Sequence, residues 1–574
     1  MDNPNIPILQ IKDLKISFAQ NGHYQEMVHS LSFDLWKGKT VGMVGESGSG
    51  KSITALSLLG LLGPQAQVKG EILWEGRDLV NLQEKEFQKI RGSRISMIFQ
   101  EPMTSLNPVY TCGNQVEEVI KIHRKLKNKE AREETIRLFQ EVELPRPESL
   151  VHSYPHQLSG GQRQRVMIAM ALASGPELLI ADEPTTALDV TVQKTILDLL
   201  IRIREKRKMS MIFISHDLGL IHQIADEVLV LYKGILVEKG NTKDIFQSPQ
   251  HPYTRGLLAC RAQDNLGLSR LPIMSDFMEL GTKGEILAIP NSIEEIRNRF
   301  RSDPQIMENR RNLIYGQESI LRVENLSKSF KSVQAVKAVS FEVFPGETLG
   351  LVGESGCGKS TLGRSLLRLI EPDSGKIFFK GQDLMELSPR SLREYRKKIQ
   401  FIFQDPYSSL NPRQSIGEIL MEPLKIFRLG NSENERKKMA FELLHKVQLL
   451  PEHFYRYPHE FSGGQRQRIG IARALALSPE FIICDESVSA LDVSVQAQII
   501  NLLIRLRNEL GLTLIFISHD LSVIRFISDR IIVMNQGKFE EVGSPDQIYN
   551  HPQSPYTRKL LEAIPGAQFP FHLN

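Results

Sequence analysis

A chain of 574 residues is longer than a single hydrophobic core usually serves, so its length predicts several domains. With 41% hydrophobic and 24% charged residues, its composition is that of an ordinary soluble globular protein. The formal net charge of +4 is small for this size and gives no reason to expect a nucleic-acid partner.

The cysteines and the apolar runs indicate in which cellular compartment the chain is expected. The 4 cysteines, at positions 112, 260, 357 and 484, form neither a disulfide framework nor a zinc pattern and fit a reducing environment. The first residues lack the basic and apolar regions of a signal peptide. The nearest candidate for a membrane span, Ala55 to Leu62, is far shorter than the roughly 18 residues required. We therefore expect a cytosolic chain, or one that docks on a membrane through a protein partner without inserting into it.

Two strands and a helix are predicted at the start of the chain. Alternating apolar residues at Ile8 to Ile11 indicate an edge strand, and Thr40 to Val44 reads as a buried strand. A glycine-rich loop follows, and then a helix from Ser52 to Leu62. The same order returns later, with an edge strand at Ile320 to Val323 and a buried strand at Thr348 to Val352.

Both glycine-rich loops fit the phosphate-binding pattern G-x-x-x-x-G-K-[ST]. In such a loop the backbone N–H groups surround nucleotide phosphates, the lysine neutralises them and the serine reaches Mg²⁺. The helix that follows adds its own amide donors and dipole. The predicted nucleotide-binding residues are Gly45, Glu46, Ser47, Gly48, Ser49, Gly50, Lys51 and Ser52 in the first copy, and Gly353, Glu354, Ser355, Gly356, Cys357, Gly358, Lys359 and Ser360 in the second.

A nearly constant offset shows that the whole domain is duplicated, because later features recur 303 residues apart (485 − 182 and 519 − 216). We expect a first domain at 1–256, a tail and linker at 257–318, and a second domain at 319–574. The linker is neither Gly/Ser-rich nor like either domain, and residues 292–301 could form a short amphipathic helix.

Each half places a glutamine after a short apolar strand, Gln100 and Gln404. A neutral amide there can reach Mg²⁺ or the attacking water, although alone it would read as a surface residue. Each half also has a buried strand that ends in Asp-Glu, at Asp182-Glu183 and Asp485-Glu486. Open α/β sheets bind ligands at this end of their strands.

The two carboxylates of each pair have separate predicted roles. We expect the aspartate to hold Mg²⁺, directly or through water, and the glutamate to orient or deprotonate the attacking water. The alternative is a solvated acidic pair that caps the next helix. The metal-site prediction is therefore Ser52, Gln100 and Asp182 in the first half, and Ser360, Gln404 and Asp485 in the second.

A histidine follows a further strand in each half, at His216 and His519. Such a histidine is most often structural, but both lie 33 residues after the glutamate (216 − 183 and 519 − 486). We interpret them as γ-phosphate sensors, so the predicted catalytic residues are Glu183, His216, Glu486 and His519.

One more motif indicates the family. Ser159, Gly160, Gly161 and Gln162, and again Ser462, Gly463, Gly464 and Gln465, precede helices that carry two arginines each. Alone, this would be a flexible turn before a basic helix. With the other motifs in order, the chain resembles the ABC ATPases, and Ala187-Leu188-Asp189 and Ala490-Leu491-Asp492 resemble their D-loop. The resemblance implies two tandem α/β P-loop NTPase domains, each with a mainly parallel sheet, an antiparallel β subdomain and an α-helical signature subdomain.

The resemblance also implies how ATP and Mg²⁺ are bound. In the family, two domains sandwich two ATP molecules head to tail, so ATP on Lys51 is completed by Ser462 to Gly464, and ATP on Lys359 by Ser159 to Gly161. Phe18 and Phe330 lie where the family stacks an aromatic ring on adenine. The interval to the lysine differs between the copies, and Tyr24 is a possible substitute for Phe18.

The sequences from Gln100 to Pro108 and from Gln404 to Pro412 resemble the di- and oligopeptide importer branch. So do the tails His251-Pro252-Tyr253-Thr254-Arg255 and Ser554-Pro555-Tyr556-Thr557-Arg558, for which the alternative is a Pro-started helix that only packs. Members of this branch often carry a cysteine cluster for an iron–sulfur centre in this tail, but only Cys260 is present here, so we expect no cluster.

The branch implies two membrane permease subunits as partners, an extracytoplasmic solute-binding protein as the source of substrate, and a peripheral location at the cytoplasmic face of the cell membrane. Residues 103–110 and 407–413 are the predicted docking surface. Peptides are the expected cargo; nickel chelates, glutathione and oligosaccharides remain alternatives. The rival class is a soluble twin-domain ATPase acting on ribosomes. It is disfavoured because the 257–318 segment is neither markedly basic nor heptad-patterned and the net charge of the chain is low.

Overall fold

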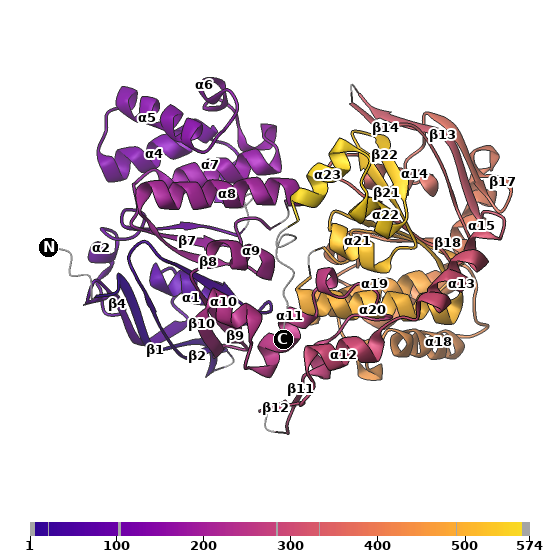
Figure 1. The fold of residues 1–574 in the computed structure, drawn as a ribbon, viewed down its shortest axis with the longest axis horizontal. Coiled ribbons are helices and arrows are strands. Elements are labelled where there is room, and N and C mark those ends of the chain that lie inside the picture. The colour runs from indigo at the N-terminus through magenta and orange to yellow at the C-terminus, as the bar shows by residue number, and fades with distance from the viewer. Residues whose placement is uncertain are drawn as a thin grey trace. The chain divides into compact units, whose positions relative to one another are not determined.

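The computed structural model describes residues 6–20, 22–100, 105–186, 188–282, 285–331, 333–489 and 491–564. The described chain divides into two compact units with the same order of elements (Figure 1). The first unit contains residues up to 258 together with 277–289, and the second contains 259–276 together with the residues from 290 onward. The expected duplicated α/β architecture is confirmed.

The centre of the first unit is a parallel sheet. Strand β3 (Thr40–Val44) lies between β8 (Ser210–Ile214) and β9 (Glu227–Tyr232), and β8 also pairs with β7 (Leu178–Asp182). Every residue of β3, β7 and β8 is buried, as expected for strands covered on both faces. The carboxyl ends of these strands therefore lie along one edge of the sheet.

An antiparallel layer joins this sheet through β2 (His23–Leu35) and β10 (Ile235–Asn241). Strand β1 (Leu9–Gln20) pairs with β2 on one side and with β4 (Ala66–Trp74) on the other. The prediction of edge strands at the start of each half was therefore wrong, and β13 likewise has two neighbours. Alternation of apolar residues shows that one face is buried, but it does not reveal how many strands lie beside it.

Helices α4 (Cys112–Arg124), α5 (Asn128–Glu141) and α7 (Gly160–Leu172) pack together as a separate helical layer (Figure 1). Their facing residues are apolar and buried, including Ile120 and Phe139. Helix α7 begins after Ser159, whose hydroxyl accepts the N–H of Gln162 in a capping box. The first unit also contains β5 (Arg77–Asp78), β6 (Ile95–Ile98), β11 (Met278–Leu280), β12 (Ile286–Ala288), α1 (Lys51–Leu58), α2 (Glu84–Phe87), α6 (Pro147–Leu150), η1 (Pro155–Gln157), α8 (Val190–Arg207), α9 (Leu218–Ile224), α10 (Thr242–Gln247) and α11 (Pro252–Ala259).

The helix after the first phosphate loop is shorter than the sequence suggested. We expected it to reach Leu62, whereas α1 ends at Leu58. Gly60 adopts a positive φ of 58°, which glycine tolerates and which ends a helix, and Pro64 follows soon after.

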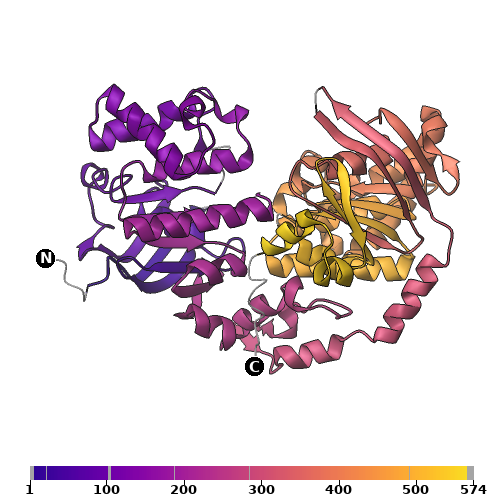
Figure 2. The ribbon, with the colours of Figure 1, turned by 45° about the horizontal axis from the view of Figure 1, so that its top comes forward.

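The second unit repeats this plan (Figure 2). It has an antiparallel sheet in the order β14-β13-β16-β17 and a mainly parallel sheet in the order β18-β19-β20-β15-β21-β22. Its strands are β13 (Leu321–Phe330), β14 (Val333–Val343), β15 (Thr348–Val352), β16 (Ser374–Phe379), β17 (Gln382–Asp383), β18 (Ile399–Ile402), β19 (Phe481–Asp485), β20 (Thr513–Ser518), β21 (Arg530–Asn535) and β22 (Lys538–Gly543). Its helices are α14 (Lys359–Leu366), η4 (Leu384–Glu386), α15 (Pro389–Lys398), α16 (Pro406–Ser409), α17 (Ile416–Ile426), α18 (Glu433–Lys446), η5 (Pro451–Tyr455), η6 (Pro458–Glu460), α19 (Gly463–Leu475), α20 (Val493–Leu510), α21 (Leu521–Ile527), α22 (Pro545–Asn550) and α23 (Pro555–Glu562).

Most of the segment that follows the first domain packs within the second unit. Leu271 is 1% exposed, and its main-chain N–H and C=O both bond to the side chain of Asn501 at 2.8 Å. This segment contains η2 (Ala262–Asp264), η3 (Met274–Asp276), α12 (Ile293–Phe300) and α13 (Pro304–Tyr315). Helix α12 is the amphipathic helix expected at 292–301, and Arg310 of α13 pairs with Asp529 at 2.9 Å.

Candidate functional site

Each phosphate loop joins a buried strand to a helix, so its backbone is fixed at both ends. Gly50 has φ of 96°, a conformation suited to glycine, and α1 begins at the next residue. The ammonium group of Lys51 donates to the carbonyl oxygens of Gly45 and Glu46, both at 2.8 Å. Lys359 makes the same contacts, at 2.8 Å to Gly353 and 2.9 Å to Glu354.

The loop serine and the strand aspartate meet in both units. Ser52 Oγ donates to Asp182 Oδ1 at 3.1 Å, and Ser360 Oγ donates to Asp485 Oδ1 at 2.8 Å. Because β7 pairs with β8, which in turn pairs with β3, the aspartate and the loop reach the same edge of the sheet. Two residues of the predicted metal site are thus adjacent in each unit.

Both aspartates lie in surroundings that oppose their charge. Burial and the nearby charge of Glu183 raise the pKa of Asp182 to about 6, against the lowering effects of Ser52 and Lys51. Burial also raises the pKa of Asp485, with Glu486 adding to the effect. A bound cation would offset this cost, because it stabilises the carboxylate form.

The glutamate after each strand has a left-handed backbone, with φ of 46° at Glu183 and 43° at Glu486. Such a conformation is costly for a residue other than glycine, and it persists only where the surrounding structure holds it. In the first unit, Glu183 N–H donates to the carbonyl of Ile214 at 2.9 Å, which ties the turn to the next strand. The carboxylate is therefore held at a defined position beyond the end of β7.

In the first unit, Glu183 Oε2 receives several contacts at once. Gln100 Nε2 donates to it at 3.1 Å, and His216 Nδ1 lies 3.2 Å away. Thr186 Oγ1 also donates to it, at 2.8 Å. Burial raises the pKa of Glu183, but His216, Thr186 and Lys51 outweigh that effect and lower it to about 2.

The second unit has a looser arrangement. Gln404 Nε2 donates to Glu486 Oε2 at 2.6 Å, whereas His519 Nδ1 lies 3.7 Å from Glu486 Oε1. Ser489, the counterpart of Thr186, donates instead to the main-chain oxygen of Glu486 at 3.0 Å. Burial raises the pKa of Glu486, but His519 and Lys359 hold it below its usual value.

The sequence argument missed Thr186. Its hydroxyl reaches the carboxylate because the chain turns sharply after Glu183, and a Thr three residues after an acidic residue carries no such signal by itself. The only available signal was that the two halves differ here, with Thr186 in one and Ser489 in the other.

The oxygen donors at each loop suit a hard cation such as Mg²⁺. In the described ranges, no group of three or more His, Cys, Asp or Glu side chains is placed to hold a metal ion by itself. Mg²⁺ needs no such cage at a nucleotide site, because it usually binds one or two protein ligands together with phosphates and water. Ser52 with Asp182, and Ser360 with Asp485, provide that sparse set.

The signature residues lie at helix N-termini in the helical layers. Ser159 and Ser462 are exposed, and each caps a 13-residue helix by accepting the N–H of Gln162 or Gln465. The glutamine side chains return the contact to the serine N–H groups, at 3.0 and 3.1 Å. Two signature serines therefore stand exposed at the positive ends of helices.

The candidate adenine platforms differ between the units. Phe330 lies at the end of β13 and is 46% exposed, whereas Phe18 is half-buried against the core of the first unit. Tyr24, the possible substitute, is 61% exposed on β2 opposite Ala19. Ala187 and Ala490 of the D-loop, and residues 101–104 of the peptide-importer motif, lie outside the described residues.

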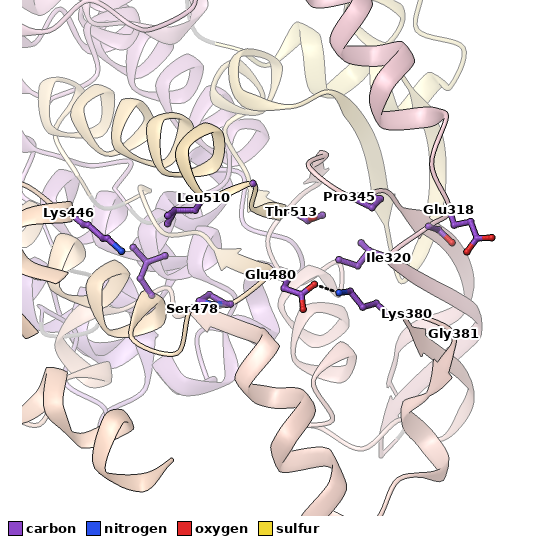
Figure 3. A pocket seen from close by; sticks show the side chains of 14 residues that line it. Glu318, Ile320, Pro345, Lys380, Gly381, Lys446, Ser478, Glu480, Leu510 and Thr513 are labelled. Atoms are coloured by element: carbon purple, nitrogen blue, oxygen red, sulfur yellow. Dashed lines mark ion pairs between the residues drawn. The ribbon is translucent and has the colours of Figure 1, made fainter. Parts of the chain in front are cut away.

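A cavity of about 610 Å³ lies elsewhere in the second unit (Figure 3). Its wall includes Pro345, Glu480 and Thr513, which stand at the amino ends of β15, β19 and β20. Figure 3 shows Lys380 and Glu480 paired across it. The cavity is at the opposite end of these strands from Lys359, so it is separate from the candidate nucleotide site.

Comparison with known proteins gives consistent matches along the chain. Residues 28–186 and 336–489 match the family described as ABC transporter. Residues 237–267 and 541–572 match the oligopeptide/dipeptide transporter C-terminal region.

Curated relatives match over almost the whole chain. The glutathione import ATP-binding proteins of Escherichia coli K12 and of Shigella flexneri serotype 5b are each 47% identical, with 98% of this chain and 90% of the relative covered. A solved ABC cassette in a post-hydrolysis state bound to ADP and phosphate is 33% identical, covering 39% of this chain and 98% of its own, with a TM-score of 0.37.

Proposed function

Because this chain belongs to the ABC transporter ATPases, with two ATP-binding domains that are each followed by a peptide-transporter tail, we propose that it powers a solute importer through two composite ATP sites. The observation that carries the proposal is the pairing, in both units, of a complete phosphate loop with an Asp-Glu strand end. Both copies retain every residue type that hydrolysis requires.

The ATP sites are composite and arranged head to tail. ATP on Lys51 is completed by Ser462, Gly463 and Gly464, and ATP on Lys359 is completed by Ser159, Gly160 and Gly161. Support comes from the exposure of Ser159 and Ser462 at helix N-termini, where an anion such as the γ-phosphate is stabilised by the helix dipole and free N–H groups. The two domains share one chain, so the closed state forms within the molecule.

Hydrolysis at each site uses the glutamate as general base. Glu183 or Glu486 accepts a proton from water, the water oxygen bonds to the γ-phosphorus, and the bond from that phosphorus to the bridging β–γ oxygen breaks to leave ADP and phosphate. His216 and His519 contact the γ-phosphate and orient the carboxylate beside them. Ser52 with Asp182, and Ser360 with Asp485, would hold Mg²⁺, which would neutralise charge at the phosphates.

Glu183→Gln and Glu486→Gln test this mechanism. Each should slow hydrolysis at its own site by about 100-fold or more, because a general base contributes that much. Because the two sites are coupled, either change should also lower the steady-state rate of phosphate release to below about half of the parent rate. Glu177→Gln and Glu480→Gln change the opposite ends of the same two strands and should keep the parent rate. A single change at Glu183 or Glu486 that leaves turnover intact contradicts two competent sites.

The imported solute is of the peptide class. The tails match the oligopeptide/dipeptide transporter C-terminal region, and the curated relatives are glutathione import ATP-binding proteins. Glutathione is itself a small modified peptide. Uptake of labelled glutathione and of a dipeptide, compared in parent and deletion strains, tests this assignment. Unchanged uptake of both, with loss of nickel-chelate or oligosaccharide uptake, would contradict it.

Two permeases in the cell membrane are the proposed partners, and a solute-binding protein outside the membrane delivers the cargo. In the part of the chain that the structure describes, no helix is long and apolar enough to span a bilayer. Val109 and Tyr407 are 72% and 65% exposed in the proposed docking segments, which supports a role in protein contact at the cytoplasmic face of the membrane. Co-purification with membrane permeases is expected, and recovery with ribosomes instead would contradict it.

A further inference from the structure

The duplicated tail motif is tied to a strand of its own unit. In the first unit, Glu238 of β10 accepts the N–H groups of Gln250 and His251, at 2.7 and 3.1 Å. In the second unit, Glu541 of β22 accepts those of Gln553 and Ser554, at 2.9 and 3.0 Å. These bonds fix the start of α11 and of α23, and with it the tyrosine that follows the motif's proline.

That tyrosine reaches the phosphate loop in both units. The backbone N–H of Glu46 donates to the phenol oxygen of Tyr253 at 3.1 Å, and the N–H of Glu354 donates to that of Tyr556, also at 3.1 Å. Tyr253 is fully buried, and its ring lies 4.5 Å from that of Tyr232, so packing sets its position. The same contact in two copies that differ in sequence around it argues against coincidence.

The residue that the tyrosine contacts also bonds to the loop lysine. Glu46 uses its N–H for Tyr253 and its carbonyl oxygen for Lys51, at 2.8 Å. Glu354 does the same between Tyr556 and Lys359, at 2.9 Å for the lysine. The tail therefore fixes the residue whose carbonyl oxygen accepts a hydrogen bond from the phosphate-binding lysine. A backbone rotation at that residue would strain both this hydrogen bond and the one to the tyrosine.

We propose that Tyr253 and Tyr556 are positioning residues of the ATP sites, which pre-organise the phosphate loop of their own unit and so set its affinity for nucleotide. The inference rests on nucleotide binding at these loops. Without the phenol hydroxyl, the loop samples more conformations before ATP binds. The free energy needed to order the loop on binding then weakens the affinity for ATP. The tail motif is then part of the ATP-binding apparatus and not only a packing element.

The test measures ATP binding at one site at a time in the full chain. In a Lys359→Ala background, binding reports the first unit, and Tyr253→Phe should weaken the Kd for ATP about fivefold, the effect of losing one hydrogen bond. In a Lys51→Ala background the same substitution should leave the Kd unchanged, whereas Tyr556→Phe should weaken it. Amide exchange should accelerate within residues 45–52 of the Tyr253→Phe chain and not across the unit.

Thr254→Val is the matched control, because Thr254 is 2% exposed on the same helix and its hydroxyl has no partner among the described residues. It removes a buried hydroxyl and should leave the Kd unchanged. The proposal is overturned if Tyr253→Phe stays within about twofold of its parent, or if Thr254→Val weakens binding equally. If the Lys359→Ala parent itself does not bind ATP, the proposed ATP site of the first unit is contradicted, and so is the proposed role of Tyr253.

Discussion

Glu183 and Glu486 stand at the same position in the two units, yet they are held differently. Glu183 Oε2 receives hydrogen bonds from Gln100 and Thr186 and lies 3.2 Å from His216. In the second unit, the histidine is 3.7 Å from Glu486, and Ser489 bonds to the main chain instead. The shared motif therefore fixes where the carboxylate stands, while residues outside the motif set how strongly its charge is stabilised.

This difference has a chemical consequence. A general base works best when its pKa is near the working pH, and strong stabilisation of the carboxylate makes it a weaker base. Glu183 is stabilised by more donors than Glu486, so the two proposed sites should differ in their pH dependence although both are complete.

Among the residues that surround the two glutamates, the histidines should have the largest effect when substituted. His216→Ala and His519→Ala should each reduce turnover at their own site by about tenfold or more, because each removes a group beside the base and the phosphate. His216 lowers the pKa of Glu183, so its removal raises that pKa, and the acid limb of the pH–rate profile moves to higher pH. The shift should be smaller for His519→Ala, given the longer distance to Glu486.

The turnover of each histidine variant is measured in a background in which the glutamate of the other site is changed to glutamine, so that only one site hydrolyses ATP. His216→Gln keeps a neutral donor and should retain part of the rate. Equal shifts of the acid limb in the two units would remove the proposed asymmetry.

The hydroxyl contact should have an intermediate effect. Thr186→Val keeps the shape of the side chain but removes the donor to Glu183, and we expect about a threefold loss of turnover at the first site, since one bond that orients the base is lost. Ser489→Ala should change the second site less than about twofold, because that hydroxyl does not bond to the carboxylate. Single-site phosphate release measures both, and equal losses would show that Ser489 contributes as Thr186 does.

Much of the site could be predicted because its chemistry dictates residue types at fixed places along the chain. A phosphate loop requires Gly50 and Lys51 after a strand, and a carboxylate pair at a buried strand end, such as Asp182 and Glu183, has few other uses. The structure brings Ser52 and Asp182 together as this logic expects.

The rest depends on how distant segments meet. The pairing of β1 on both sides reflects sheet order, which local alternation does not encode. The contact between Tyr253 and Glu46 joins residues 207 apart, and Thr186 reaches Glu183 only through a left-handed turn. In the sequence, such contacts are visible only as a motif whose role is not assigned, as in the duplicated tail.

The smallest expected effect concerns the metal. Arg364 lies 3.8 Å from Asp485 in the second unit, whereas Leu56 occupies the equivalent position in the first. A guanidinium so close competes with a cation for the carboxylate, so Arg364→Leu should lower the Mg²⁺ concentration for half-maximal ATPase at the second site. The change should be only about twofold, because the arginine side chain is 41% exposed and solvent screens its charge.

A Mg²⁺ titration in the Glu183→Gln background isolates the second site, and Arg364→Lys, which keeps the charge, should resemble the parent. If Arg364→Leu instead raises the Mg²⁺ requirement, the arginine assists the metal site, and the two units differ in how they bind the metal as well as in how they hold the base. If it has no effect, the difference between the units is confined to the two glutamates, and Arg364 is a surface cation whose charge water has already screened.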